Sequence, residues 1–356
     1  MSQLFEPITL RALTMPNRVW VSPMCQYSSM DGLPNDWHLV HLGQFVAGGA
    51  GLIFTEATAI VPEGRISPQD TGIWSEDHTR AWRGVTDFVH DNGGLIGMQL
   101  AHAGRKGSTY RPWEGHGSVP ASDGGWQAVG PSGSSFGDYA APRALSTQEV
   151  AELPGRFAEA ARRAISAGFD TVELHFAHGY LVHQFLSPLS NERDDQYGGD
   201  FSGRTRLALD IADAVRVEVG DDLPVITRIS ATDWVEEGGW DIDQSVRLSA
   251  LLADRGVDLI DVSSGGNVHG VRIPTGPGYQ VPFATRIRVE AGMPTGAVGM
   301  ITEPDQAEKI IGNGQADVVL LARELLREPH WPLRAAHALG AQVSWVNQYL
   351  RARYRD

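Results

Sequence analysis

Two histidines and a tyrosine stand close together in the segment HFAHGY, which ends a short apolar run. The imidazoles of His175 and His178 could both donate to one carbonyl or nitro oxygen, and the electron density that they withdraw would make a conjugated β-carbon electrophilic. The phenol of Tyr180 is a candidate proton donor to the adjacent α-carbon. A zinc-binding histidine pair, core histidines and a half-buried tyrosine are the alternatives, although no set of further metal ligands stands out in the sequence.

Other distinctive residues lie at the ends of further short apolar runs that are rich in β-branched residues. In chain order they are Ser22, Pro23, Met24 and Cys25 after the first run, Ala57 after the second, Gln99 in the third, His175 at the end of the fourth, Arg228 in the fifth, Ser264, Gly265 and Gly266 after the sixth, Gly299 at the end of the seventh, and Ala322 and Arg323 at the end of the eighth. One such residue would mean little, but eight strand ends in succession meet in one pocket if the strands form a parallel barrel.

The apolar runs themselves predict strands separated by helices. The predicted strands are Arg18–Ser22, Gly51–Glu56, Leu95–Leu100, Thr171–His175, Pro224–Ile229, Asp258–Ser263, Gly296–Gly299 and Asp317–Leu321, and the clearest helical patterns are Thr147–Ala167, Arg204–Val219 and Asp241–Arg255. Eight such units predict an α/β fold of the (β/α)8 or TIM barrel type. A doubly wound open sheet is the alternative, but no GxGxxG motif follows the first strand.

The chain is predicted to form a single domain with loop insertions. Gly104–Arg143 follows the third strand and Val268–Phe283 follows the sixth, and both are rich in glycine and proline. Loops in these places leave the C-terminal face of a barrel, where binding residues lie. The barrel itself is expected to span about residues 18–340, and residues 341–356 are expected to form a tail.

Composition limits the classes of function. The 356 residues carry a formal net charge of −14 with no basic run, which makes nucleic acid an unexpected partner. Cys25 is the single cysteine, so an intramolecular disulfide and a cysteine-ligated iron–sulfur cluster are excluded. No apolar segment approaches the ~18 residues of a membrane span. The first residues do not resemble a signal peptide, and we expect a cytoplasmic protein.

The motifs at the strand ends resemble those of the Old Yellow Enzyme family of FMN-dependent ene-reductases. They are SPMCQYS (22–28), GLIFTEA (51–57), MQLAHAGRK (98–106), HFAHGYLVHQFLSPLSNERDDQYGG (175–199), GAVGMIT (296–302) and LARELLREP (321–329). They occur in the expected order along nearly the whole chain, and the longest is highly specific. The sequence is most similar to the bacterial branch that carries a cysteine beside the flavin, the thermophilic-type and xenobiotic reductase A-like enzymes.

The resemblance implies a cofactor site for non-covalent FMN. Gly299, with the backbone amides of Ala322 and the guanidinium of Arg323, would hold the phosphate, at the usual phosphate site of a barrel. Gln99 would bond the pyrimidine edge, and Arg228 would lie near N1 and O2, where a cation stabilises the anionic reduced flavin. The alternative for Arg228 is an ion pair with a strand-end carboxylate such as Asp233. The residues expected on the N5 side are Ser22, Pro23, Met24, Cys25 and Ala57.

The resemblance also implies the reaction and its remaining residues. NADPH or NADH would reduce the flavin, and hydride from flavin N5 would pass to an activated C=C bond, with His175 and His178 on the activating oxygen and Tyr180 as proton donor. Tyr27 would help to hold that oxygen. Cys25 would adjust the flavin potential, although a small buried side chain is the plainer interpretation of a lone cysteine. The QYLR sequence near the C-terminus predicts a homodimer or tetramer in which Arg351 reaches the neighbouring subunit's site.

Two departures from the family pattern stand beside this resemblance. Ala322 occupies a position that is usually glycine, although its backbone amide is retained, and the insertion at 104–143 could reshape the substrate entrance. Three other functions remain open at this stage. They are a related flavin barrel dehydrogenase, a non-catalytic flavin-binding protein, and a flavin-free barrel lyase or isomerase.

Overall fold

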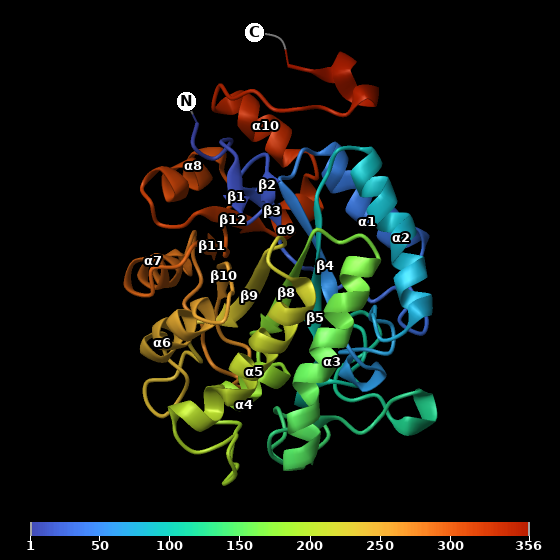
Figure 1. Ribbon diagram of the computed structural model, residues 1–356, viewed down its shortest axis with the longest axis vertical. Helices are drawn as coiled ribbons and strands as arrows, with labels where there is room; N and C mark the ends of the chain where they lie inside the picture. Colours follow the sequence, from blue (N-terminus) through green and yellow to red (C-terminus); the bar gives the residue numbers. More distant parts are fainter. Residues whose placement is uncertain (1, 355–356) are drawn as a thin grey trace.

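Eight parallel strands form a closed barrel surrounded by helices (Figure 1). The computed structural model describes residues 2–354. The barrel strands are β3 (Val19–Val21), β4 (Leu52–Ala59), β5 (Ile96–Ala101), β8 (Thr171–Phe176), β9 (Val225–Ser230), β10 (Leu259–Ser263), β11 (Thr295–Ala297) and β12 (Val318–Leu321). Each strand pairs with its neighbours in chain order, and β12 pairs with β3 to close the ring. The predicted TIM barrel is therefore confirmed, and the open doubly wound sheet is excluded.

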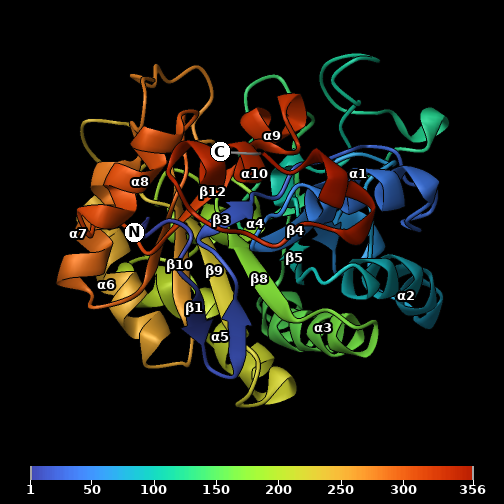
Figure 2. The ribbon, with the colours of Figure 1, turned by 90° about the horizontal axis from the view of Figure 1, so that it is seen from above.

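Helices cover the outside of the barrel (Figure 2). They are α1 (Asp36–Ala47), α2 (Glu76–Asp91), α3 (Thr147–Ser166), α4 (Leu181–Leu186), α5 (Phe201–Val219), α6 (Ile242–Ala253), α7 (Val281–Glu290), α8 (Pro304–Gly312), α9 (Arg323–Arg327) and α10 (Trp331–Ala338). The start of α3 shows why the sequence forms a helix there. Ser146 accepts from the backbone N–H of Glu149, whose carboxylate accepts from the Ser146 backbone in return. The three helices predicted from the sequence are thus present with nearly the predicted limits.

Several predicted boundaries are wrong by a few residues. The seventh strand ends at Ala297, so Gly299 lies in the following turn rather than closing the strand. Ala57 lies inside β4 instead of after it, next to a register shift in the pairing of β4 with β5. Arg323 begins α9. The predicted insertion at 268–283 overlaps the start of α7, because Pro282 in the first turn of a helix was interpreted as a loop residue.

The interior of the barrel is layered along the strands. At the N-terminal end lies an apolar layer, and the hairpin of β1 (Ile8–Leu10) and β2 (Leu13–Met15) packs against it through Leu10 and Met15. Every second residue along a strand faces the interior, so the next residues inward on β5, β8, β9 and β10 are polar. Side chains at the C-terminal ends of the strands then form the mouth of the barrel.

The two insertions meet over that mouth. The 104–143 segment contains two short paired strands, β6 (Val129–Gly130) and β7 (Arg143–Ala144). Arg105 is buried, and its guanidinium donates to the backbone oxygen of Asn267 at 2.7 Å and to the Asn267 side chain at 3.1 Å. This arginine therefore ties the loop after β5 to the loop after β10.

The tail lies at the opposite end of the molecule from these loops (Figures 1 and 2). Residues 342–346 run beside Pro16 and Asn17, which follow the β1–β2 hairpin, and a crevice of about 340 Å³ lies between them. A short 3-10 helix, η4 (Asn347–Ala352), comes next and carries the exposed Arg351. Residues 355–356 of the predicted tail lie outside the described residues. None of the helices in 2–354 has the length and apolar character that a bilayer crossing requires.

Candidate active site

A tight turn after β8 brings together the two histidines and the tyrosine. His175 is in β8, and its ring centre lies 5.2 Å from that of His178 and 5.1 Å from that of Tyr180. His178 and Gly179 both have positive φ angles, 58° and 69°, a conformation that bends the chain back over the strand end. The three predicted side chains therefore share one corner of the barrel mouth.

This turn is held by backbone-to-backbone contact with the loop after β10. A Cβ atom placed on Gly179 would lie 2.1 Å from the backbone oxygen of Gly266, and one on Gly266 would lie 2.7 Å from the backbone of His178. Neither position has room for a side chain, so glycine is required at both. Ser230 adds a third element, because its hydroxyl accepts from the His178 N–H at 2.9 Å.

Both histidines are neutral at neutral pH. Burial lowers the pKa of each well below its ordinary value, and the nearby Arg228 guanidinium lowers both further. The Oγ of Ser263 lies 2.7 Å from Nε2 of His178, and if this hydroxyl donates, the ring proton is left on Nδ1. Nδ1 of His175 is buried and has no hydrogen-bond partner within residues 2–354. Each ring can thus offer one N–H.

Ser263 was not singled out from the sequence. It is the last residue of β10, 85 positions after His178, and a serine at a strand end carries no local signal of a histidine partner. The sequence analysis singled out the next three residues, Ser264, Gly265 and Gly266, at the strand end. The hydroxyl of Ser264 donates to the side-chain oxygen of Gln280 at 2.5 Å.

Tyr180 is half-buried and lies beside the ammonium group of Lys106, a residue to which the sequence analysis assigned no role. Burial raises the pKa of Tyr180 well above its ordinary value, so the phenol is protonated. Nζ of Lys106 lies 5.0 Å from the centre of the Tyr180 ring and donates to the backbone oxygens of His178 and Gly266 at 2.8 and 2.9 Å. Burial lowers the pKa of Lys106 to about 7.

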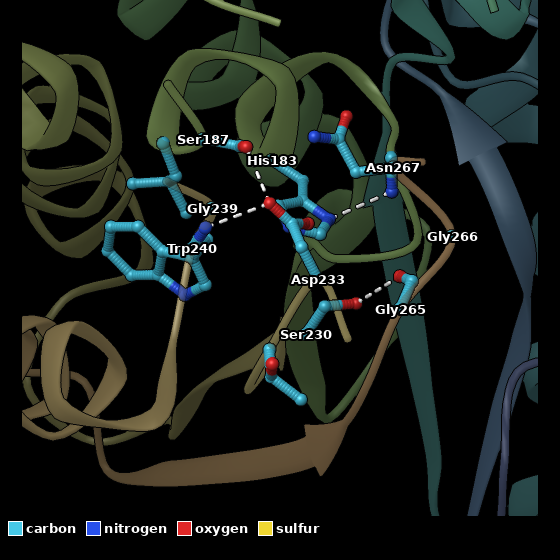
Figure 3. A network of polar contacts seen from close by, with 12 residues as sticks. His183, Ser187, Ser230, Asp233, Gly239, Trp240, Gly265, Gly266 and Asn267 are labelled. Carbon is cyan, nitrogen blue, oxygen red and sulfur yellow. Dashed lines mark hydrogen bonds and ion pairs between the residues drawn. The ribbon is translucent and has the colours of Figure 1, made fainter. Parts of the chain in front are cut away.

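A buried His183–Asp233 pair lies behind the turn (Figure 3). Nε2 of His183 is 3.1 Å from Asp233, and its Nδ1 accepts from the Gly179 N–H at 2.9 Å. Asp233 also accepts from the Ser187 hydroxyl and from the Trp240 backbone N–H at 2.6 and 2.9 Å. The sequence offered Asp233 as a partner of Arg228, and this is wrong. Arg228 forms its ion pair with Asp261, with Nε 3.0 Å from Oδ2.

Arg228 and Gln99 belong to the polar layer just inside the mouth. Arg228 is on β9 and Gln99 on β5, and both are buried. Gln99 donates to Glu173 on β8 at 2.6 Å. The two residues predicted to meet the flavin are thus each held by a buried carboxyl group of the same layer, Gln99 by Glu173 and Arg228 by Asp261.

Cys25 lies on the other side of the mouth in the loop that follows β3. Cys25 and Tyr180 pack against one small apolar cluster that contains Ala57. Burial raises the pKa of the Cys25 thiol, and the carboxylates of Asp70 and Glu56 raise it further, so the thiol is protonated. Tyr27, two residues further along this loop, has a positive φ of 50°.

A cavity of about 360 Å³ opens beside the ends of β11 and β12. Its lining includes Ser263, Gly299, Ala322 and Arg323. Arg323 is exposed and forms no ion pair within residues 2–354. The three residues predicted to hold a phosphate therefore share one cavity that contains an uncommitted guanidinium. His175, Tyr180 and Cys25 do not line this cavity.

These features fit FMN. The cavity offers a cationic end for a phosphate, and the polar layer offers a guanidinium and an amide for a pyrimidine edge. Ser22 Oγ and His175 Nδ1 are buried polar atoms at the mouth that have no partner in the described chain. A bound group with polar edges would satisfy such atoms.

Arg351 is the one predicted site residue that the fold does not bring near the others. It lies on η4 at the N-terminal end of the barrel, beyond α10. Within residues 2–354, no three His, Cys, Asp or Glu side chains are grouped so that they could hold a metal ion.

Comparison with known proteins shows the family. Residues 3–342 match the NADH:flavin oxidoreductase / NADH oxidase family. The chain is 46% identical over 353 residues to an NADPH dehydrogenase of Geobacillus sp. (strain WCH70), and 44% identical over 352 residues to that of Bacillus subtilis (strain 168). Each alignment covers 98% of this chain and 98% of the relative.

Solved structures share the fold over almost the whole chain. Morphinone reductase superposes with a TM-score of 0.79 at 30% identity, covering 96% of this chain and 91% of its own. The Old Yellow Enzyme homologue from Zymomonas mobilis superposes with a TM-score of 0.78 at 28% identity, covering 99% and 97%. This chain therefore belongs to the NADH:flavin oxidoreductase / NADH oxidase family, as an FMN-dependent oxidoreductase of the Old Yellow Enzyme type that uses a nicotinamide reductant.

Proposed function

We propose that this chain reduces electron-poor C=C bonds of enones, enals, maleimides or nitroalkenes. The observation that carries the proposal is the corner formed by His175, His178 and Tyr180, where two neutral imidazoles and a protonated phenol lie with ring centres about 5 Å apart. This set matches the needs of one reaction, in which an oxygen must be polarised and a carbon must be protonated. The names of relatives, NADPH dehydrogenase and morphinone reductase, support it.

Each residue has a separate role in the proposed reaction. The N–H groups of His175 and His178 hold the carbonyl or nitro oxygen of the substrate, and Ser263 fixes the ring of His178. Hydride for the β-carbon would be supplied by FMN, which would itself receive hydride from the nicotinamide. Tyr180 gives its phenolic proton to the α-carbon. The charge left on its oxygen is stabilised by Lys106, whose ammonium lies 5.0 Å from the ring centre.

The cofactor residues follow from the cavity and the polar layer. Gly299, Ala322 and Arg323 would hold the phosphate, whereas Gln99 and Arg228 would bond the pyrimidine edge. The N5 side of the ring would be lined by Ser22, Pro23, Met24, Cys25 and Ala57. Tyr27 would bond the substrate oxygen together with the histidine pair.

Anaerobic stopped-flow spectroscopy tests the proposed reaction. The purified protein is reduced with NADPH or NADH while flavin absorbance is followed, and is then mixed with cyclohexenone, N-methylmaleimide or a nitroalkene. We expect rapid reoxidation with formation of the saturated product, and the names of the relatives favour NADPH as the faster reductant. A flavin that reacts with a nicotinamide but with none of these acceptors would support another flavin dehydrogenase, and one that is never reduced would support a non-catalytic flavin-binding protein.

Replacing Cys25 with alanine is expected to lower the flavin reduction potential and to leave FMN content unchanged. A protonated thiol beside N5 and O4 can donate a weak hydrogen bond to the electron-rich reduced ring, and alanine cannot. Spectroelectrochemical titration measures the potential. An unmoved potential with unchanged half-reaction rates would leave Cys25 as a small packing residue.

We propose further that the active protein is a homodimer or a dimer-based tetramer in which the tail, residues 341–356, completes a neighbouring site. The loop before α1 and α1 itself expose large apolar side chains, with Trp37 52% and Val40 64% exposed. Phe88 of α2 and Tyr349 of the tail are also exposed and line one crevice with Gly43 of α1. Side chains of this kind on adjoining elements suit burial against a second copy.

Truncation after Val346 is therefore expected to lower activity about 10-fold to 100-fold, the worth of a hydrogen bond to a charged group. FMN content should change little, because the cofactor residues lie at the other end of the barrel. Arg351→Met should reproduce the loss, and Arg353→Met serves as the matched control. Turnover measures the contribution of the tail to activity, and sedimentation velocity measures the oligomeric state. Full activity after truncation, or a monomer at micromolar concentration, would contradict it.

A further inference from the structure

Four polar side chains lie at one level inside the barrel, on four neighbouring strands. They are Gln99 on β5, Glu173 on β8, Arg228 on β9 and Asp261 on β10, and all are buried. The strand pairing sets Glu173 opposite Gln99 and Asp261 opposite Arg228. Below the layer lie buried apolar side chains such as Phe54 and Leu259, which offer no hydrogen bonds to its charges.

Several carboxyl oxygens of this layer have no hydrogen-bond partner within the described residues. Gln99 donates to Oε1 of Glu173 at 2.6 Å, and Nε of Arg228 lies 3.0 Å from Oδ2 of Asp261. Oε2 of Glu173 and both carboxyl oxygens of Asp261 are buried and have no hydrogen-bond partner within the described residues. An ionised carboxylate can only accept, so two such groups in contact cannot satisfy each other.

The charges do not balance either. Two ionised carboxylates and one guanidinium would leave a net negative charge in the barrel, and an uncompensated buried charge is costly. Burial raises the pKa of Glu173 and that of Asp261, and the neighbouring Asp261 raises the pKa of Glu173 further. One proton between the two groups makes the layer neutral and turns one orphaned oxygen into a donor to the other side chain.

We propose that Glu173 and Asp261 share one proton at neutral pH, and that this proton determines the net charge presented to the flavin by the Arg228 layer. The second part rests on the proposed placement of Arg228 at the pyrimidine edge. While the proton is present, the layer is neutral and tolerates an extra negative charge on the flavin. Once it is lost, the layer is negative and opposes that charge.

Few charged or titratable groups face Glu173 and Asp261, so a change in their protonation can be attributed to these two carboxyl groups. Within residues 2–354, Arg228 is the one cation that acts on both carboxyls, and Gln99 is neutral. On the far side, β11 contributes Gly296, which has no side chain, opposite Asp261. His175 lies two residues beyond Glu173 on β8 and is neutral, because burial and Arg228 lower its pKa.

Infrared spectroscopy of the holoenzyme in H₂O and D₂O tests the shared proton directly. At neutral pH we expect a carbonyl band of a protonated carboxylic acid that shifts in D₂O and is lost in Glu173→Gln. Burial also raises the pKa of Asp70, so this residue is expected to give a second carboxylic acid band. The variant Asp70→Asn identifies that band, because it removes it. Asp261→Asn provides an independent variant, in which Glu173 ionises beside Arg228 and the band is again lost. Survival of every such band in both layer variants, or its absence in the wild type, would overturn the shared proton.

The dependence of the flavin midpoint potential on pH tests the link to Arg228. In the wild type we expect a steeper decrease at alkaline pH, corresponding to one additional proton taken up per two electrons, and a loss of this extra slope in Glu173→Gln. Retained visible absorbance shows that each variant has folded and kept FMN. An unchanged slope in Glu173→Gln would overturn the link. These readouts do not depend on alkene reduction, so they can succeed where the proposed function fails.

Discussion

Replacing Tyr180 with phenylalanine is expected to slow the oxidation of the reduced enzyme by alkenes by about 10²-fold to 10⁴-fold, the usual contribution of a positioned general acid. Phenylalanine keeps the ring that packs beside His175 and under Lys106 and removes only the proton. The rate of reduction by the nicotinamide should be nearly unchanged, since that half-reaction needs no proton from this phenol. Stopped-flow measurement of both half-reactions separates the two effects.

Two controls make this result specific to the proton. Ferricyanide takes electrons without a proton, so it should oxidise the variant at the wild-type rate. Tyr197→Phe removes another buried hydroxyl outside the barrel mouth and should leave both half-reactions intact. If Tyr180→Phe reduced cyclohexenone at the wild-type rate, the proton would have to come from another group or from water.

Replacing His178 with alanine is expected to slow alkene reduction by about 10²-fold to 10³-fold, the cost of losing one donor to a developing oxyanion. Neutral imidazole offers a single N–H, which lies on Nδ1 when the Ser263 hydroxyl donates to Nε2. A phenol whose oxygen accepts the same N–H would lose this contact, so its charge-transfer band with the flavin should appear only at much higher phenol concentration. Phenol titrations and the oxidative half-reaction measure the two losses.

His178→Asn is a useful second variant to compare with the alanine variant. Its side-chain amide can place an N–H near the position of Nδ1, so His178→Asn should recover part of the phenol affinity that alanine loses. The positive φ of 58° at this position is also tolerated by asparagine. Equal phenol binding in the alanine variant and the wild type would remove His178 from the proposed oxyanion site.

The sequence predicted the barrel and most strand ends because each unit carries its own local pattern. The β-branched runs that became β8, β9 and β10 are short, apolar and followed by distinctive residues, and their predicted limits are nearly those observed. The seventh strand was placed about a residue too late, because Gly296, Ala297 and Gly299 resemble turn residues as much as strand residues. The β1–β2 hairpin was missed, since three-residue strands carry almost no periodic signal.

The partners of the site residues could not be predicted in the same way. Arg228 was assigned Asp233 as its alternative partner because that carboxylate is close in sequence, yet Asp261 on the next strand is the actual neighbour. Residues at the same level of adjacent parallel strands are separated by a whole helix and two loops, so spacing along the chain does not reveal them. Ser263 and Lys106 escaped notice for the same reason.

The interlocked glycines at 179 and 266 have a consequence for attempts to change the substrate range. Each leaves no room for a side chain because the other loop's backbone fills the space, so a substitution at either position moves both loops and the histidine pair with them. Saturation libraries should therefore hold these two codons fixed. Diversity is better placed in the 104–143 insertion, for example at Phe136, whose ring packs against Lys106 at 4.4 Å without a backbone constraint of this kind.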